Sequence, residues 1–210
     1  MHGTVLGPQN LQISADAPGV VAEYVEEKLG APMLYINGAA GNLAPIYSVY
    51  PDFNSGHLSQ FRVLLGDRIL AANRKLGPTT SEVEFSLGAK IVETPRKEGL
   101  GWAPDLGDYV RKTSTGATVV RLPLRFLKIN NDVAIWAAPL ELFCEIAMDI
   151  RNRSPFPNTF YFGYCNGWLG YFPTKAEFAF GGYEPSTTPF TEQGEEDLTH
   201  AVIGYLQGWH

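Results

Sequence analysis

The chain has 210 residues, enough for one sizeable hydrophobic core or about one and a half typical domains. Hydrophobic residues make up 45% and charged residues 18%, an ordinary globular composition in which no apolar run approaches the length of a membrane span. The net charge of -6, with no cluster of lysine and arginine, argues against a broad nucleic-acid interface.

The first third of the chain is predicted to begin as a loop and to continue as a helix and a strand. Met1 to Ala15 is irregular and has no signal peptide. We interpret this start as the result of a cut made inside a larger protein. Asp16 as N-cap and Gly30 as stop bound a helix with an apolar stripe. Residues 32–37 predict a short strand buried on both faces. The small residues 38–42 that follow would let a ligand approach the backbone closely.

The rest of the chain mixes strands with helices and contains no internal repeat. A Gly-, Pro- and charge-rich excursion interrupts the pattern and is long enough to suggest a lid or an interface. The mixture predicts an α/β fold with a mixed sheet flanked by helices, forming part of a larger α/β domain. The predicted elements are a helix at 58–76, a strand at 83–87, the excursion at 94–115, a hairpin of 118–129 and 133–137, a helix from Pro139, a strand at 159–165 and a helix at 192–207.

Polar features follow three of the predicted strands. They are the segment 38–42, Glu141 near the start of a helix, and Tyr171 in an aromatic, glycine-rich stretch that also contains Tyr183. In open α/β sheets, ligand sites gather beyond the carboxyl ends of strands, so the three features predict one convergent site. The alternative is that the tyrosines only cap the core, with buried rings and hydrated hydroxyl groups.

By residue type, His2, Glu141 and a tyrosine phenolate could assemble a zinc site, because zinc accepts nitrogen and oxygen ligands. Spacing alone does not establish this set, since there is no HExxH motif and the two cysteines, Cys144 and Cys165, lack metal-ligand spacing. The alternatives are that His2 is a disordered terminal residue, and that Glu141 is merely a first-turn acid that the helix dipole favours.

Four segments carry a resemblance to the neutral/alkaline ceramidases, which are zinc-dependent amidases. The family pattern H-x-x-S-M-N-N-x-N-x-L-x-x-S-D-N-x-G is similar to HGTVLGPQNLQISADAPG, and S-N-x-G-D-x-S-P-N is similar to GAAGNLAPI. The G-E-F-T-T segment resembles Leu140-Glu141-Leu142-Phe143. The pattern C-N-x-Y-x-x-Y-x-x-T-x-E-x-Y…R-Y-E resembles CNGWLGYFPTKAEFAFGGYE. The segments occur in the same order as in the family.

The resemblance implies that His2, Glu141 and Tyr171 are zinc ligands, and that Tyr171 and Tyr183 are catalytic. The hydroxyl of Tyr183 would donate a hydrogen bond to the developing oxyanion. The family has one more zinc-binding histidine far upstream, to which nothing in this chain corresponds. Residues 1–210 would then be a single α/β domain or fragment, the C-terminal half of a ceramidase-like catalytic domain. The implied partner is the N-terminal half of the same parent protein.

The resemblance also assigns substrate binding to Gly38, Asn42 and Trp168. Gly38 stands where the family has a serine often treated as a key active-site residue, and Asn42 replaces an aspartate. Water activated by zinc could still attack an N-acyl bond. The implied substrate is ceramide-like, and the isolated chain is expected to be weakly active or inactive. The alternatives are hydrolysis of another amide or ester, and a non-catalytic binding or assembly module; homo-oligomer formation is left open.

Overall fold

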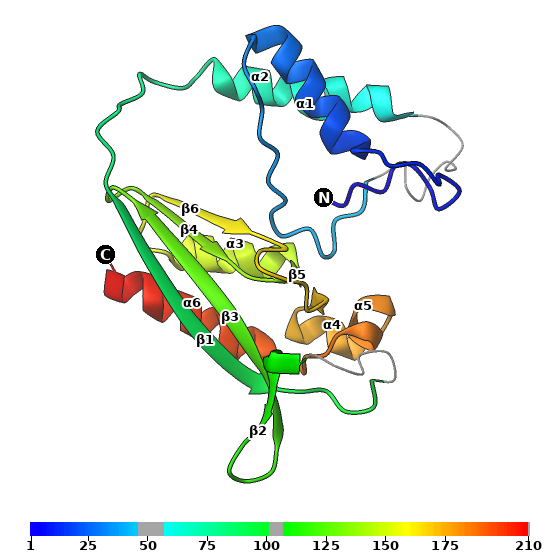
Figure 1. The fold of residues 1–210 in the computed structure, drawn as a ribbon, viewed down its shortest axis with the longest axis vertical. Helices are drawn as coiled ribbons and strands as arrows, with labels where there is room; N and C mark the ends of the chain where they lie inside the picture. The colour runs from blue at the N-terminus through cyan, green and yellow to red at the C-terminus, as the bar shows by residue number, and fades with distance from the viewer. Residues whose placement is uncertain (46–56, 101–106, 210) are drawn as a thin grey trace. The chain divides into compact units, whose positions relative to one another are not determined.

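The structure is a computed structural model that describes residues 1–45, 57–100 and 107–209 (Figure 1). The chain divides into two compact units, and each has its own hydrophobic core. The first unit consists of Met1–Ile36 and Ala44–Ser81, and the second of Asn37–Leu43 and Glu82–His210. Within the described ranges, no helix has both the length and the apolar character needed to cross a membrane.

The first unit is built on α1 (Asp16–Leu29), which ends at Gly30 in a left-handed conformation as the sequence predicts. The predicted N-cap is displaced by one residue, since Ala15 is the N-cap and Asp16 is the first residue of α1. Its carboxylate accepts hydrogen bonds from the backbone amides of Val5 at 3.1 Å and Leu6 at 2.8 Å, and so ties the N-terminal loop to the start of α1. The core of this unit consists of Val5, Ala17, Val21, Val25 and Phe61.

Two predictions for the first third of the chain are corrected. Residues 32–37 form no strand, because no described strand pairs with them, and Leu34 is 87% exposed. The helix predicted at 58–76 is divided into three pieces with different hydrogen-bond repeats. These are a 3-10 helix at His57–Gln60, a π-helix at Arg62–Gly66 and the helix α2 at Asp67–Asn73.

The second unit contains a mixed five-stranded sheet, which confirms the predicted class. Its strands run in the order β1-β3-β4-β6, with β2 also pairing with β3, and all pairs are antiparallel except β4 with β6. A separate parallel pair is formed by β5 and β7. The bounds are β1 Phe85–Pro95, β2 Val110–Lys112, β3 Thr118–Ile129, β4 Val133–Ala137, β5 Glu141–Leu142, β6 Asn158–Phe162 and β7 Tyr171–Phe172.

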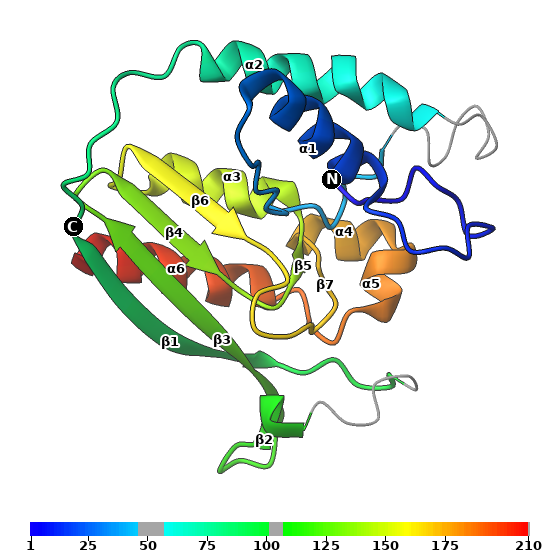
Figure 2. The ribbon, with the colours of Figure 1, turned by 45° about the horizontal axis from the view of Figure 1, so that its top comes forward.

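Helices α3 (Cys144–Arg153) and α6 (Gly194–Trp209) cover one face of the five-stranded sheet (Figures 1 and 2). Two shorter helices, α4 (Lys175–Phe180) and α5 (Tyr183–Thr187), follow β7, and a 3-10 turn at Gly107–Tyr109 precedes β2. The core between sheet and helices includes Leu122, Leu124, Phe126, Trp136, Ile146, Ile150, Leu198, Val202 and Leu206.

The hairpin of 118–129 and 133–137 is confirmed with the predicted bounds. The helix predicted from Pro139 is wrong at its start, because Glu141 and Leu142 first pair with β7 as a short strand and α3 begins only at Cys144. Of the predicted excursion at 94–115, residues 101–106 lie outside the described residues.

We define the outer face as the side of the five-stranded sheet away from α3 and α6. Its central row runs across four strands through Leu87, Leu127, Ile135 and Phe160, and each of these residues is the register partner of the next. Leu87 is 81% exposed and Phe160 is 52% exposed. Strands β1, β3, β4 and β6 therefore alternate between residues buried under helices and residues of the outer face, and the central row of that face is apolar.

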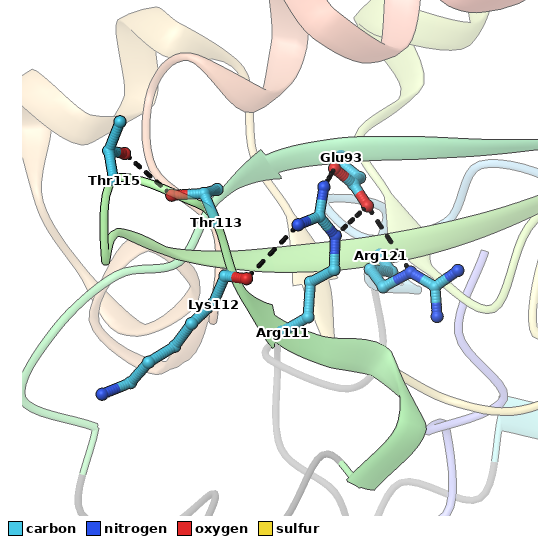
Figure 3. A network of polar contacts seen from close by, with 6 residues as sticks. All are labelled: Glu93, Arg111, Lys112, Thr113, Thr115 and Arg121. Carbon is cyan, nitrogen blue, oxygen red and sulfur yellow. Dashed lines mark hydrogen bonds and ion pairs between the residues drawn. The ribbon is translucent and has the colours of Figure 1, made fainter.

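The far end of β1 carries charge on the outer face (Figure 3). Arg111 of β2 donates through two guanidinium nitrogens to the carboxylate of Glu93, and Arg121 of β3 approaches the same carboxylate at 3.5 Å. These guanidinium groups, with Arg111 contributing most, lower the pKa of Glu93. The outer face therefore carries charge at Arg125, in the row next to Leu127, and at this ion cluster.

The two faces of the sheet predict different costs for removing a leucine from the isolated chain. We expect Leu124→Ala to lower the free energy of unfolding by about 2–5 kcal/mol, because Leu124 is fully buried under the helices. Leu87→Ala should cost less than about 1 kcal/mol, because it removes an exposed side chain. Urea denaturation of both variants measures the difference, and equal losses would contradict the placement of the two faces.

Candidate active site

The candidate site is built on the short ladder between β5 and β7. Glu141 and Tyr171 are direct register partners in this parallel pair, although thirty residues separate them in the chain. The backbone amide of Glu141 donates to the carbonyl of Gly170 at 3.0 Å, and that of Phe143 donates to the carbonyl of Phe172 at 3.1 Å. The backbone therefore fixes the two predicted ligands next to each other.

The Glu141 side chain is 7% exposed and is held at both carboxylate oxygens. The indole nitrogen of Trp168 donates to Oε1 at 2.7 Å, and the Tyr164 hydroxyl donates to Oε2 at 3.0 Å. A carboxylate has about four lone-pair positions, so these two bonds still leave acceptor capacity for another group. Glu141 is thus oriented, and it is no simple first-turn helix acid.

The loop between β6 and Trp168 adopts an unusual backbone conformation. Tyr164 has φ of 56° and Asn166 has φ of 62°, values in the left-handed region that bulky residues rarely adopt. Such conformations cost of order 1–3 kcal/mol each and persist where the surroundings enforce them, often at functional sites. In this loop they lie on either side of Cys165, just before the residue that donates to Glu141. The sequence does not mark Tyr164 as a site residue, since nothing in its type or spacing distinguishes it from a strand-end aromatic.

A pocket of about 150 Å³ is lined by Trp168, which bonds to this carboxylate, and by Gly170, Tyr171, Tyr183 and Thr187. The rings of Tyr171 and Tyr183 meet edge to face with centroids 5.8 Å apart, and Tyr183 is 65% exposed. Burial, followed by the negative charge of Glu141, raises the pKa of Tyr171 to about 12. Both tyrosines therefore open on the pocket, and the Tyr171 hydroxyl is neutral at physiological pH when no cation is bound.

The segment 37–43 packs against the backbone of β5. The amide of Gly41 donates to the carbonyl of Leu142 at 2.9 Å, and a Cβ atom added to Gly41 would lie 2.3 Å from the carbonyl oxygen of Glu141. Gly38 is less confined, since a Cβ there would meet only the Tyr161 carbonyl oxygen at 3.7 Å. Small residues in this segment thus permit a close approach between backbones.

The Asn42 side chain is bonded to the start of α3. Its Oδ1 accepts from the backbone amide of Cys144 at 2.9 Å, and its Nδ2 donates to Glu145 at 2.7 Å. Asn42 therefore satisfies an amide at the helix start from a distant part of the chain. Substrate binding by Asn42 and Gly38 stays a prediction.

The predicted ligand His2 belongs to the first unit, whereas Glu141 and Tyr171 belong to the second. Zinc binding by this set of three stays a prediction. Within the described ranges, no group of three histidine, cysteine, aspartate or glutamate side chains is placed to hold a metal ion.

Aromatic residues of the stretch around Tyr171, among them Trp168, Phe172 and Phe180, could either line an apolar acyl groove or pack in the core. Phe172 is buried and packs against Phe190 with ring centroids 4.6 Å apart, so it belongs to the core. Trp168 lines the pocket, and Phe180 on α4 is 84% exposed. The core-packing alternative therefore holds for Phe172 and not for Trp168.

Comparison with solved structures identifies the class of fold. No protein-family model and no curated protein matches the sequence. The chain has a neutral ceramidase-like fold. It is similar to the neutral ceramidase of Pseudomonas aeruginosa, with a TM-score of 0.66 and 17% sequence identity over 97% of this chain and 42% of that chain. A structure described as a ceramidase complexed with C2 matches with a TM-score of 0.66 and 14% identity, over 97% of this chain and 43% of that chain.

The resemblance drawn from the four sequence segments is thereby confirmed at the level of the fold. The chain spans less than half the length of the ceramidase chains that it matches. An identity below one fifth leaves the residue assignments to the sequence segments and the site geometry.

The charge of Glu141 predicts a measurable effect on Tyr171. In the presence of a chelator, Tyr171 should ionise with a pKa of about 12, and Glu141→Gln should lower this pKa because it removes the neighbouring negative charge. The pKa should stay above about 10, the ordinary tyrosine value, because burial remains. Ultraviolet titration of tyrosinate measures this, and the difference from a Tyr171→Phe variant identifies the group. An unchanged midpoint would contradict the proximity of the two side chains.

Proposed function

We propose that the chain contributes to a zinc-dependent amidohydrolase that cleaves the N-acyl bond of a ceramide-like substrate. The observation that carries the proposal is the oriented, buried Glu141, which pairs with Tyr171 and bonds to Trp168, two residues that line an apolar pocket. The shared fold with neutral ceramidase supports the choice of reaction class. That protein's name describes its own activity, and its extension to this chain is our proposal.

The donor set at β5 and β7 fits part of a zinc site. Glu141 and Tyr171 supply two oxygen atoms from paired strand positions, and zinc accepts oxygen ligands alongside imidazole. Trp168 and Tyr164 bond to the carboxylate, as outer-shell donors do around a ligand carboxylate. A divalent cation would also offset the negative charge that helps to raise the pKa of Tyr171. His2 and one histidine outside this chain are the proposed imidazole ligands.

Zinc, when bound, would polarise the amide carbonyl and lower the pKa of a bound water toward about 7. The chain's own residues supply orientation and hydrogen bonds. Trp168 and Tyr164 hold Glu141 in one geometry, so the carboxylate does not have to reorganise during the reaction. The Tyr183 hydroxyl would donate to the developing oxyanion, because its ring stands beside that of Tyr171 at the pocket wall.

The substrate is proposed to lie along the pocket, with Trp168 as an apolar wall. Gly38 and Asn42 would act through the segment 37–43, whose close packing on β5 adjoins the backbone of Glu141. Gly38 has no side chain, so a serine nucleophile at that position is unavailable and water is the proposed attacking group. The proposed partner is a polypeptide that corresponds to the part of neutral ceramidase outside the matched region.

The test is an assay of the full-length gene product with ceramide and with short N-acyl amides, before and after treatment with a chelator. We expect hydrolysis that the chelator abolishes and added zinc restores, and little activity from residues 1–210 alone. Hydrolysis of short amides or esters without hydrolysis of ceramide would assign the same site to another substrate. Absence of hydrolysis and of zinc uptake would favour the non-catalytic binding or assembly module.

A further inference from the structure

The outer face of the sheet is an apolar surface that the second unit does not cover. Four of its side chains are at least half exposed, namely Phe85, Leu87, Ile91 and Phe160, with exposed fractions of 64%, 81%, 50% and 52%. Soluble monomers rarely expose large contiguous apolar patches, and such patches mark interaction sites. The outer face therefore has the properties of an interface.

The strand pattern shows that several strands contribute apolar residues to this surface, so it does not depend on one exposed residue. Leu87, Leu127, Ile135 and Phe160 form a continuous row across β1, β3, β4 and β6. The neighbouring row pairs Phe85 with Ile129 and Val133. Solvated sheet faces normally alternate to polar residues. In these two rows the outer face is apolar as far as Asn158 at the β6 end, as in strands between two layers, whereas the next row carries Arg125.

The edge of the apolar surface is marked by charge. At the far end of β1 the same face carries Glu93, which binds Arg111 and Arg121 (Figure 3). Interfaces of this kind have an apolar centre and a polar rim. The occupant would therefore cover the two apolar rows and stop on the side where Arg125 and the ion cluster lie.

We propose that the outer face docks an apolar layer of the polypeptide that corresponds to the part of neutral ceramidase outside the matched region. The matched solved chain extends well beyond the 42% that this chain covers, so a protein of that architecture has ample further chain to supply a layer. The assignment of the occupant rests on the proposed function, because it takes the partner from the ceramidase-like reading. The apolar character of the surface, and the fact that the second unit leaves it uncovered, rest on the strand register within that unit.

Hydroxyl-radical footprinting tests this assignment without measuring activity. The 210-residue chain and the full-length gene product are oxidised in parallel, and labelling of Phe85, Leu87, Ile91 and Phe160 is read by mass spectrometry. We expect labelling to fall at least five-fold in the full-length protein. Met148 on α3, which is 49% exposed, serves as the control and should be labelled equally in both samples.

A matched substitution separates docking from folding. Leu87→Glu should leave the unfolding midpoint of the 210-residue chain within error, and should lower the midpoint and soluble yield of the full-length protein several-fold more than Met148→Glu does. Equal labelling of the outer face in both samples would overturn the proposal. Protection that already exists in the isolated chain and is lost in Leu87→Glu, with a dimer seen in analytical ultracentrifugation, would assign the surface to a second copy and also overturn it. Protection in a full-length protein that hydrolyses no amide would sustain the docking surface and contradict only the proposed function.

Discussion

Replacing Glu141 with glutamine is expected to lower kcat/KM of the full-length protein on its amide substrate by about 10³-fold. Glutamine keeps the size of the side chain and one acceptor oxygen but removes the charge that the proposed zinc site requires. In the variant one of the two oxygens becomes an NH2 group. Either the Trp168 indole or the Tyr164 hydroxyl then faces that group and loses its acceptor, so the two bonds that orient the side chain are not both kept. The free energy of unfolding should change little compared with this loss of rate.

Glu145→Gln is the matched control for this variant. Glu145 lies four residues further along the chain, is exposed, and bonds to Asn42 and not to the pocket residues. We expect it to retain activity within about three-fold, because Glu145 is exposed and glutamine keeps an acceptor oxygen for the Asn42 side chain. Zinc content is measured on both variants by atomic absorption. If Glu141→Gln bound zinc and turned over substrate as the unchanged protein does, Glu141 would have no part in the site.

The sheet could be read from the sequence where the pattern is local. The hairpin of β3 and β4 has the predicted bounds because alternating apolar residues surround a turn centred on residues 130–132, and such a turn sets the register directly. Residues 32–37 have the same apolar composition and form no strand, because strand formation needs a partner and composition does not provide one. The start of α3 was misplaced for the same reason, since the two-residue strand β5 exists only through its pairing with β7.

The candidate site shows the same division. Glu141 and Tyr171 could be placed together because both follow strand ends and because the resemblance pairs them, and the structure makes them register partners. Tyr164 could not be found, since its role depends on a left-handed backbone conformation that its residue type disfavours. The use of Asn42 by the start of α3 was also hidden, because the two segments are about one hundred residues apart.

Introducing a methyl group at Gly41 should damage both the fold of the second unit and its site. The Cβ of alanine at this position would lie 2.3 Å from the carbonyl oxygen and 2.9 Å from the carbonyl carbon of Glu141, distances that no side-chain rotation can relieve because both contacts are backbone atoms. Either the segment 37–43 or β5 must move. We expect Gly41→Ala to lower the free energy of unfolding by about 1–3 kcal/mol, the usual cost of overpacking.

Movement of β5 also displaces the carboxylate, and a shift of about 1 Å at a reacting group can cost about 10²-fold in rate. Gly41→Ala should therefore lower kcat more than its loss of stability explains, when activity is measured well below the unfolding midpoint. Gly204→Ala in α6 is the matched control, because its added methyl group meets nothing within 4 Å. Equal activities of the two variants would show that the close approach of Gly41 to β5 does not position Glu141. A selective loss in Gly41→Ala would show that Gly41 positions the Glu141 carboxylate through backbone packing, without any contact of its own with substrate.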